Sequence, residues 1–69
     1  MYKVFTKSLS RIDNISDSYY REDAVAAAAE RAPALVLYHN DEGKEVGFWV
    51  NQNGQTTPAT DAEIDAFWA

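Results

Sequence analysis

Two apolar runs of strand length, separated by a short turn, constrain the fold of this chain more than any other feature. The first run is continuous from Ala34 to His39, and the second extends from Glu45 to Asn51. Residues 40–44 between them are turn formers, and Gly43 is placed to take the left-handed conformation that closes a type I turn with a bulge. The spacing therefore predicts an antiparallel β-hairpin.

An alanine-rich segment ahead of the hairpin predicts a helix over residues 21–32. Five alanines follow Asp23, and alanine is the best helix former. Glu22 and Asp23 in the first turn and Arg31 in the last match the helix dipole, and Pro33 ends the run. Residues suited to cap the helix start precede it: Ser16, Asp17 and Ser18. One face is small and apolar, which lets the helix lie close on a sheet: Tyr20, Ala24, Val25, Ala28 and Ala32.

The segment before this helix carries weaker signals. Tyr2 to Phe5 places apolar residues on both sides of Lys3, which predicts a short strand at a sheet edge. Residues 6–18 are mostly polar and predict a long loop. Three aliphatic side chains are expected to hold this loop against the body: Leu9, Ile12 and Ile15.

The C-terminal segment predicts a turn, a short strand and a helix. Asn53-Gly54 favours a tight turn, followed by a return strand over residues 55–57. Thr60 and Glu63 have the spacing of a capping box, and the apolar residues after them repeat at helical spacing: Ile64, Phe67 and Trp68. The predicted order is β-α-β-β-(β)-α. We expect one α+β domain over residues 1–69, with a mainly antiparallel sheet of three to four strands, the Ala-rich helix packed on it, and a short C-terminal helix.

The length and the side-chain inventory argue against an enzyme. A chain of 69 residues buries only about 60% of its unfolded surface, and nucleotide-binding or barrel folds need far more chain. His39 is the only histidine, cysteine is absent, and no nucleophile-elbow or phosphate-loop motif occurs. We therefore expect no catalytic residue, no metal and no cofactor.

The hydropathy and charge patterns also argue against membranes and nucleic acid as partners. No apolar run approaches the roughly 20 residues that span a bilayer, and the N-terminus lacks the apolar stretch of a signal peptide. We expect a soluble, cytoplasmic protein. The segment Val46 to Val50 resembles the aromatic strand on which RNA-binding domains stack bases, but acidic residues flank it, so we expect no direct nucleic-acid binding.

The formal charge of −5 is unevenly distributed along the chain. Residues 22–69 hold two bases and nine acids, a balance that repels nucleic acid and attracts basic partners. Acids at helix N-termini interact favourably with the helix dipole, which explains part of this excess. Turn geometry does not require the glutamates on each side of Lys44. These hairpin acids serve either a basic partner or only solubility. The candidates for pairing with lysines and arginines of a larger, basic protein or nucleoprotein partner are Asp41, Glu42, Glu45, Asp61, Glu63 and Asp65.

Aromatic residues of the predicted hairpin provide candidate anchors for the same partner. Strand alternation points Phe48 to one sheet face and Trp49 to the other. We expect the Ala-rich helix to cover one face and the opposite face to carry Tyr38 and Trp49. Two interpretations stay open: Phe67 and Trp68 fold over Trp49, or part of this face remains an aromatic patch for a partner.

In size, acidity and helix-plus-hairpin order, the chain resembles the small phage-encoded inhibitors of host defence nucleases, the anti-CRISPR proteins. The resemblance implies an inhibitor that occupies the basic DNA-binding or guide-RNA-binding groove of an effector complex. The residues independently favour a stoichiometric binding protein that presents acids and aromatics to a basic site. The alternative is a structural or regulatory subunit that docks through an open sheet edge or an aromatic sheet face, with the acids serving only solubility.

Overall fold

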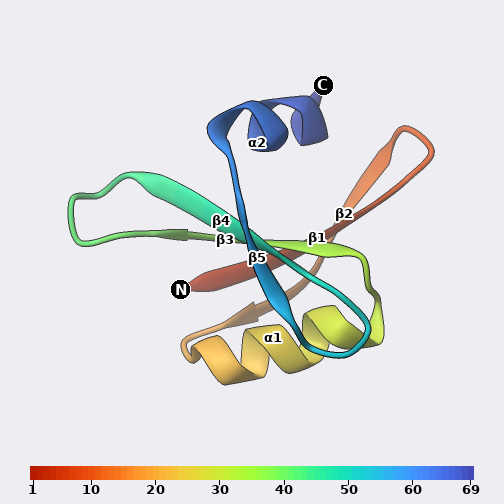
Figure 1. Ribbon diagram of the computed structural model, residues 1–69, viewed down its shortest axis with the longest axis horizontal. Coiled ribbons are helices and arrows are strands. Elements are labelled where there is room, and N and C mark those ends of the chain that lie inside the picture. The colour runs from red at the N-terminus through yellow and green to blue at the C-terminus, as the bar shows by residue number, and fades with distance from the viewer.

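The computed structural model describes all 69 residues and places a five-stranded antiparallel sheet between two helices (Figure 1). The strands are β1 (Tyr2–Ser8), β2 (Arg11–Ser18), β3 (Ala34–His39), β4 (Glu45–Val50) and β5 (Thr56–Ala59), and the helices are α1 (Arg21–Glu30) and α2 (Asp61–Trp68). The spatial order of the strands is β2-β1-β3-β4-β5. The predicted α+β class is confirmed, but the sheet has five strands where the sequence predicts three to four.

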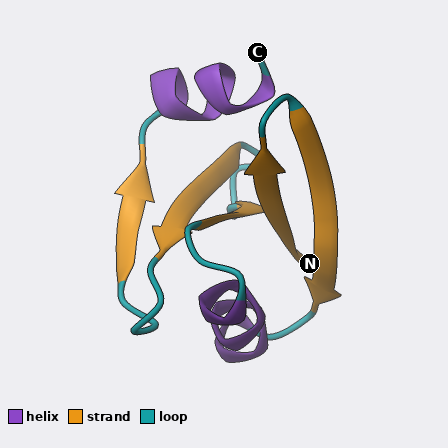
Figure 2. Ribbon diagram, turned by 90° about the vertical axis from the view of Figure 1, so that its right-hand side faces the viewer, coloured by secondary structure: helices purple, strands orange, loops and turns teal.

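The two helices lie on opposite sides of the twisted sheet, as Figure 2 shows. Successive side chains of β3 point to opposite faces, so Val36 packs on the α1 side and Leu35 on the α2 side. Neither helix combines the length and the apolar composition needed to cross a membrane.

The N-terminal hairpin is the main departure from the sequence prediction. Residues 6–18, predicted as a loop, instead complete β1 and form β2. Leu9 and Ser10 connect the two strands, and Leu9 has a φ of 58°, a conformation that glycine or asparagine usually supplies. A turn built from leucine and serine, without glycine, proline, asparagine or aspartate, carries only a weak turn signal. The Leu9 side chain is 98% exposed, so the prediction that it anchors this segment is also wrong.

A bulge in β2 further hides this strand from sequence analysis. The register shifts between Val4 and Phe5, so that Ile15 is an extra residue in β2 without a partner in β1. Ile15 packs toward α1, whereas Ile12 packs toward α2. The bulge and the charged residues of β2 interrupt the regular alternation by which strands are recognised.

The start of α1 differs from the prediction because β2 occupies the expected capping segment. Ser16 and Asp17 pair with β1, and the N-cap residue is Tyr20, whose side chain makes no capping hydrogen bond. The Ser18 hydroxyl instead accepts a hydrogen bond from the Tyr20 amide (3.3 Å) and donates one to the Tyr20 carbonyl (3.2 Å). The helix therefore begins without the side-chain cap that its sequence offers.

The body of α1 matches the alanine-rich prediction. Ala24 and Ala28 are fully buried against the sheet, and the helix ends at Glu30, slightly before the predicted end. Arg31 is the C-cap residue and does not belong to the last turn. The small side chains allow the helix backbone to approach the strands closely.

The sheet carries a separate apolar cluster on each face. The α1 face has the larger cluster of buried residues: Val4, Ala24, Ala28, Ala34, Val36, Phe48 and Val50. The α2 face has the smaller one: Leu35, Leu37, Ile64 and Phe67. The apolar residues needed for two faces come from continuous runs such as β3, which is buried over its first four residues.

The remaining turns and the C-terminal helix largely follow the sequence prediction. Gly43 has a φ of 78°, and the Asn40 side chain organises the β3–β4 turn by accepting hydrogen bonds from two backbone amides at 3.0 Å. Gly54 has a φ of 77° in the next turn, and β5 lies slightly later than the predicted return strand. Thr60 and Glu63 form the predicted capping box at the start of α2.

Candidate functional site

Acidic side chains concentrate on the β3–β4 hairpin and on α2. We call this set the acidic edge, and all its members are exposed: Asp41, Glu42, Glu45, Asp61, Glu63 and Asp65. Lys44 is the only base on these two segments. The five bases and five acids of the rest of the chain cancel, so the six acids and one lysine of these segments account for the entire formal charge of −5.

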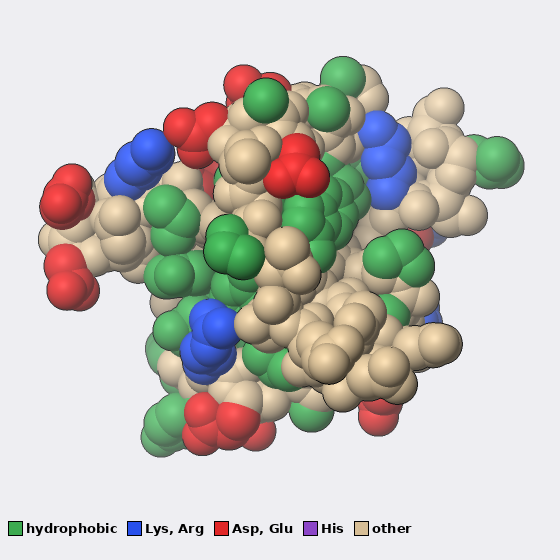
Figure 3. Space-filling model, in the orientation of Figure 1, with side chains coloured by type: hydrophobic (Ala, Val, Ile, Leu, Met, Phe, Trp, Pro, Cys, Tyr) green, Lys and Arg blue, Asp and Glu red, His purple; other side chains and the backbone are tan.

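An ion pair joins the two segments of the acidic edge. The Lys44 ammonium lies 3.2 Å from the Asp61 carboxylate, which brings the hairpin beside the start of α2. Figure 3 shows acidic side chains at the hairpin tip and over α2, with a lysine between them. Both partners of the ion pair are largely exposed, so the pair contributes little to stability. It does show that the two acidic segments are neighbours.

Most carboxylates of the acidic edge have no partner within the molecule. Asp61 pairs with Lys44, and Glu63 accepts a hydrogen bond from the Thr60 amide at 2.9 Å. The other four make no ion pair and no side-chain hydrogen bond: Asp41, Glu42, Glu45 and Asp65. These four carboxylates are therefore free to accept hydrogen bonds from a binding partner.

The two predicted aromatic anchors do not share a face, and that expectation is wrong. Tyr38 lies on the α1 face, where its ring is 4.9 Å from that of Tyr2 and 6.1 Å from that of Phe48, measured between centroids. Trp49 lies on the α2 face, half-buried, 5.9 Å from the ring of Phe67. Tyr38 pairs with Val46 in β4, and alternation then places Trp49 on the opposite side.

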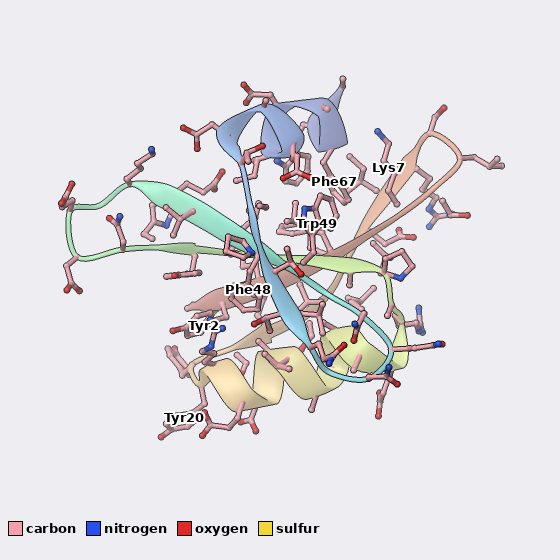
Figure 4. All side chains as sticks on the ribbon, viewed as in Figure 1. Tyr2, Lys7, Tyr20, Phe48, Trp49 and Phe67 are labelled. Carbon is pink, nitrogen blue, oxygen red and sulfur yellow. The ribbon has the colours of Figure 1, made fainter.

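The C-terminal helix covers Trp49 only in part. Phe67 is buried against Trp49, as one of the two open interpretations expects (Figure 4). Trp68 instead packs edge-on against Phe5, at 5.0 Å between centroids, and keeps 45% of its surface exposed. Trp68 is thus the accessible indole of this face.

Beside Trp68, the α2 face is hollowed to a volume of about 260 Å³. This depression, the Trp68 hollow, opens between the end of α2 and the strands β1, β3 and β4. The residues that line it are Met1, Lys3, Phe5, Leu37, Tyr38, His39, Glu45 and Trp68. Because Glu45 also belongs to the acidic edge, the hollow and the edge form one continuous surface.

Lysines secure both ends of α2 and thereby position this surface. At the C-terminal end, the Lys7 ammonium donates hydrogen bonds to the carbonyls of Phe67 (2.8 Å) and Ala69 (3.1 Å). The same ammonium lies 5.8 Å from the centroid of the Phe67 ring. Lys44 holds the other end through Asp61. No sequence signal points to Lys7, because it lies within the predicted loop, 60 residues from its partner.

Tyr2 and Tyr38 pack together on the α1 face, and Tyr19 and Tyr20 lie between the end of β2 and the start of α1. Tyr2 is in register with Ser18, so Tyr19 and Tyr20 follow close to it, and their side chains are 78% and 64% exposed. Figure 4 shows Tyr2 and Tyr20 near the start of α1. Tyr19 and Tyr20 are therefore two exposed rings away from the α2 face. The prediction that Tyr20 belongs to the apolar face of the helix is wrong, because Tyr20 is the N-cap residue and its side chain is exposed.

His39 and the carboxylates are not arranged as a metal site. No group of three or more histidine, cysteine or acidic side chains is placed to hold a metal ion. His39 is exposed at the end of β3, opposite Glu45 in the strand register. No protein-family model matches the chain, and comparisons with curated proteins and with solved structures find no match either.

Proposed function

We propose that this chain is a non-enzymatic, stoichiometric binding protein that places its acidic edge in the basic, nucleic-acid-binding site of a larger partner. The observation that carries this proposal is the location of the charge. The whole excess of −5 lies on the hairpin and α2, while the rest of the surface is balanced. Charge that served only solubility would not need to be confined to two adjoining segments.

Duplex DNA offers a physical model for this surface. It presents about one phosphate charge per 1.7 Å of helix axis, so a competitor needs several carboxylates close together. The acidic edge supplies six, four of which have no partner within the chain. Such a surface attracts a basic groove over long range and accelerates association at low salt.

The resemblance to anti-CRISPR proteins extends the proposal to the kind of partner. The partner would then be a CRISPR effector complex, and the chain a phage-encoded inhibitor that acts in the host cytoplasm by displacing DNA or guide RNA. Trp68 replaces Tyr38 and Trp49 as the aromatic anchor in this proposal, because it is the exposed indole beside the acidic edge.

Affinity capture from the source cell, eluted with a salt gradient and followed by mass spectrometry, would identify the partner. The purified partner is then titrated with the wild-type protein, with and without the nucleic acid that it binds. We expect a steep salt dependence and mutual exclusion with that nucleic acid. A ternary complex of the three components would contradict the proposal.

A charge-matched pair of variants tests which carboxylates matter. Asp41→Lys with Glu42→Lys should weaken binding about tenfold or more and lower the salt dependence. The control, Asp17→Lys with Glu30→Lys, changes the net charge equally at exposed positions outside the acidic edge. Equal effects of the two variants would show that only net charge matters, and no effect of either would reject the acidic edge as the binding surface.

The exposed tyrosines favour a second candidate function, that of a structural or regulatory subunit. Tyr19 and Tyr20 expose 78% and 64% of their surface, and tyrosine is a frequent anchor of protein interfaces. In that case the replacement of both by serine abolishes capture of the partner, and elution depends little on salt. Retained capture by this variant would remove the second candidate.

A further inference from the structure

The Trp68 hollow has the properties of a receptor for a single cationic side chain. We propose that it binds an arginine of the partner, with the guanidinium stacked on Trp68 and hydrogen-bonded to Glu45. The identity of the partner rests on the function proposed above, whereas the arginine site is a property of this chain alone. An arginine bound in the hollow would add one specific contact to the long-range attraction between the acidic edge and a basic partner.

The shape of the hollow suits a side chain better than a metabolite. Its volume of about 260 Å³ falls below the range of about 300–1,000 Å³ that is usual for small-molecule sites. Phe5 and Leu37 supply apolar lining, and Trp68 stands beside them from the end of α2. Gly47 contributes to this shape, because a Cβ there would lie 2.6 Å from Cδ2 of Leu37 and force that side chain to move.

Two residues of the hollow, Trp68 and Glu45, suit a planar cation. Tryptophan is the best aromatic partner for a cation, and Trp68 keeps 45% of its surface exposed. Glu45 is exposed and makes no ion pair, so both carboxylate oxygens can accept hydrogen bonds. A guanidinium satisfies both groups at once, since it stacks flat on a ring and donates two parallel hydrogen bonds to a carboxylate. A lysine ammonium cannot do both in this way.

Lys3, His39 and Met1, which carries the α-amino group, also line the hollow and on their own would favour an anion. Glu45 is the only acidic residue of the lining, and the further negative charge that attracts a cation lies outside it, on the acidic edge. The acidic edge, with six carboxylates and only Lys44 among them, adjoins the hollow through Glu45. Lys3 is exposed and makes no ion pair or side-chain hydrogen bond, so its ammonium can turn into solvent when a guanidinium enters.

Nuclear magnetic resonance titration of the full chain tests the site without the partner. The probe is N-acetyl-arginine amide, and its control is N-acetyl-citrulline amide, which has nearly the same shape but no charge. We expect the arginine probe to cause saturable shifts at the Trp68 indole N–H and the Glu45 amide, with much smaller shifts from the citrulline probe. Glu45→Gln should weaken the arginine probe about fivefold, and Trp68→Leu by a similar factor. Amide spectra of both variants report whether the fold is retained.

Three results would overturn the arginine site. One is an equal response to arginine and citrulline, and another is a response confined to the hairpin tip around Asp41 and Glu42. The third is saturation by inorganic phosphate with no response to arginine, which would assign the hollow to an anion through Lys3 and His39. None of these results changes the outcome of the charge-reversal experiment with the partner. The arginine site can therefore be rejected while the acidic edge is retained as the binding surface. Conversely, arginine binding in the hollow together with unchanged partner binding after reversal of Asp41 and Glu42 would reject only the proposed function.

Discussion

The two faces of the sheet are covered in different ways. On the α1 face, a ten-residue helix lays buried alanines directly on the strands. On the α2 face, an eight-residue helix buries Ile64 and Phe67 and is held at its two ends by lysines. The first face is closed by packing, whereas the second combines packing with polar contacts and leaves Trp68 partly exposed.

The two faces therefore differ in role: the α1 face stabilises the fold, whereas the α2 face exposes polar and aromatic side chains. A two-turn helix is marginal in water and persists only where it is docked. The ion pair and the hydrogen bonds that Lys7 donates to the last carbonyls orient α2 without burying its outer side. Three acids and an indole therefore stay exposed there, and Asp65 is the one of these acids without a partner within the chain. The α1 face supplies the rigid support, and the α2 face carries the groups to which we assign binding.

The largest expected effect tests the α1 face. Phe48→Ala removes a ring that is only 5% exposed, and we expect a loss of about 3–5 kcal/mol in the free energy of unfolding, enough to unfold much of the protein. Urea denaturation measures it. Phe67→Ala on the α2 face is the comparison and should cost about 2 kcal/mol, because α2 can detach while the rest of the fold survives. Equal losses would mean that the two faces support the fold equally.

A second prediction concerns the close contact beneath α2. Gly47→Ala places a Cβ 2.6 Å from the Leu37 side chain and 2.9 Å from the Val36 carbonyl, and should cost about 2 kcal/mol by overpacking. Gly43→Ala is the control, since its Cβ meets nothing within 4 Å and only the φ of 78° is unfavourable. We expect Gly43→Ala to lower the free energy of unfolding by about 1 kcal/mol. A cost at position 47 no larger than that at 43 would show that Leu37 moves aside freely.

The attachment of α2 gives a third, smaller prediction. Lys7→Met keeps the apolar stem but removes the hydrogen bonds to the last carbonyls of α2, and should cost about 1 kcal/mol. Hydrogen exchange should accelerate at α2 amides and not at α1 amides. Lys3→Met serves as the control, because Lys3 makes no such bonds. Uniform acceleration in both helices would contradict the separate attachment of α2.

The smallest expected effect is on the stability of the acidic edge itself. Asp41→Lys with Glu42→Lys should change the unfolding free energy by less than about 0.5 kcal/mol, since both side chains are exposed and unpaired. Thermal unfolding measures this change. A larger loss would show that the two acids support the hairpin, and the binding experiments with this variant would then need to be corrected for its stability.

Elements with local signals were predictable from the sequence. The β3–β4 hairpin follows from two apolar runs and a glycine at the one turn position that needs a positive φ. The alanine run specifies α1, and the capping box specifies the start of α2. Each signal lies within a few neighbouring residues, so it can be recognised without knowing the fold.

The arrangement of the site depends on contacts between distant parts of the chain. Lys44 meets Asp61 across 17 residues, and Lys7 meets Phe67 across 60, and no local pattern encodes either pair. β2 likewise becomes a strand because β1 is beside it, despite a bulge and a turn without glycine. The free energy of such contacts is gained only when the whole sheet assembles. The composition therefore specifies how many acids the protein has, and assembly of the sheet specifies that they meet on one edge beside an exposed tryptophan.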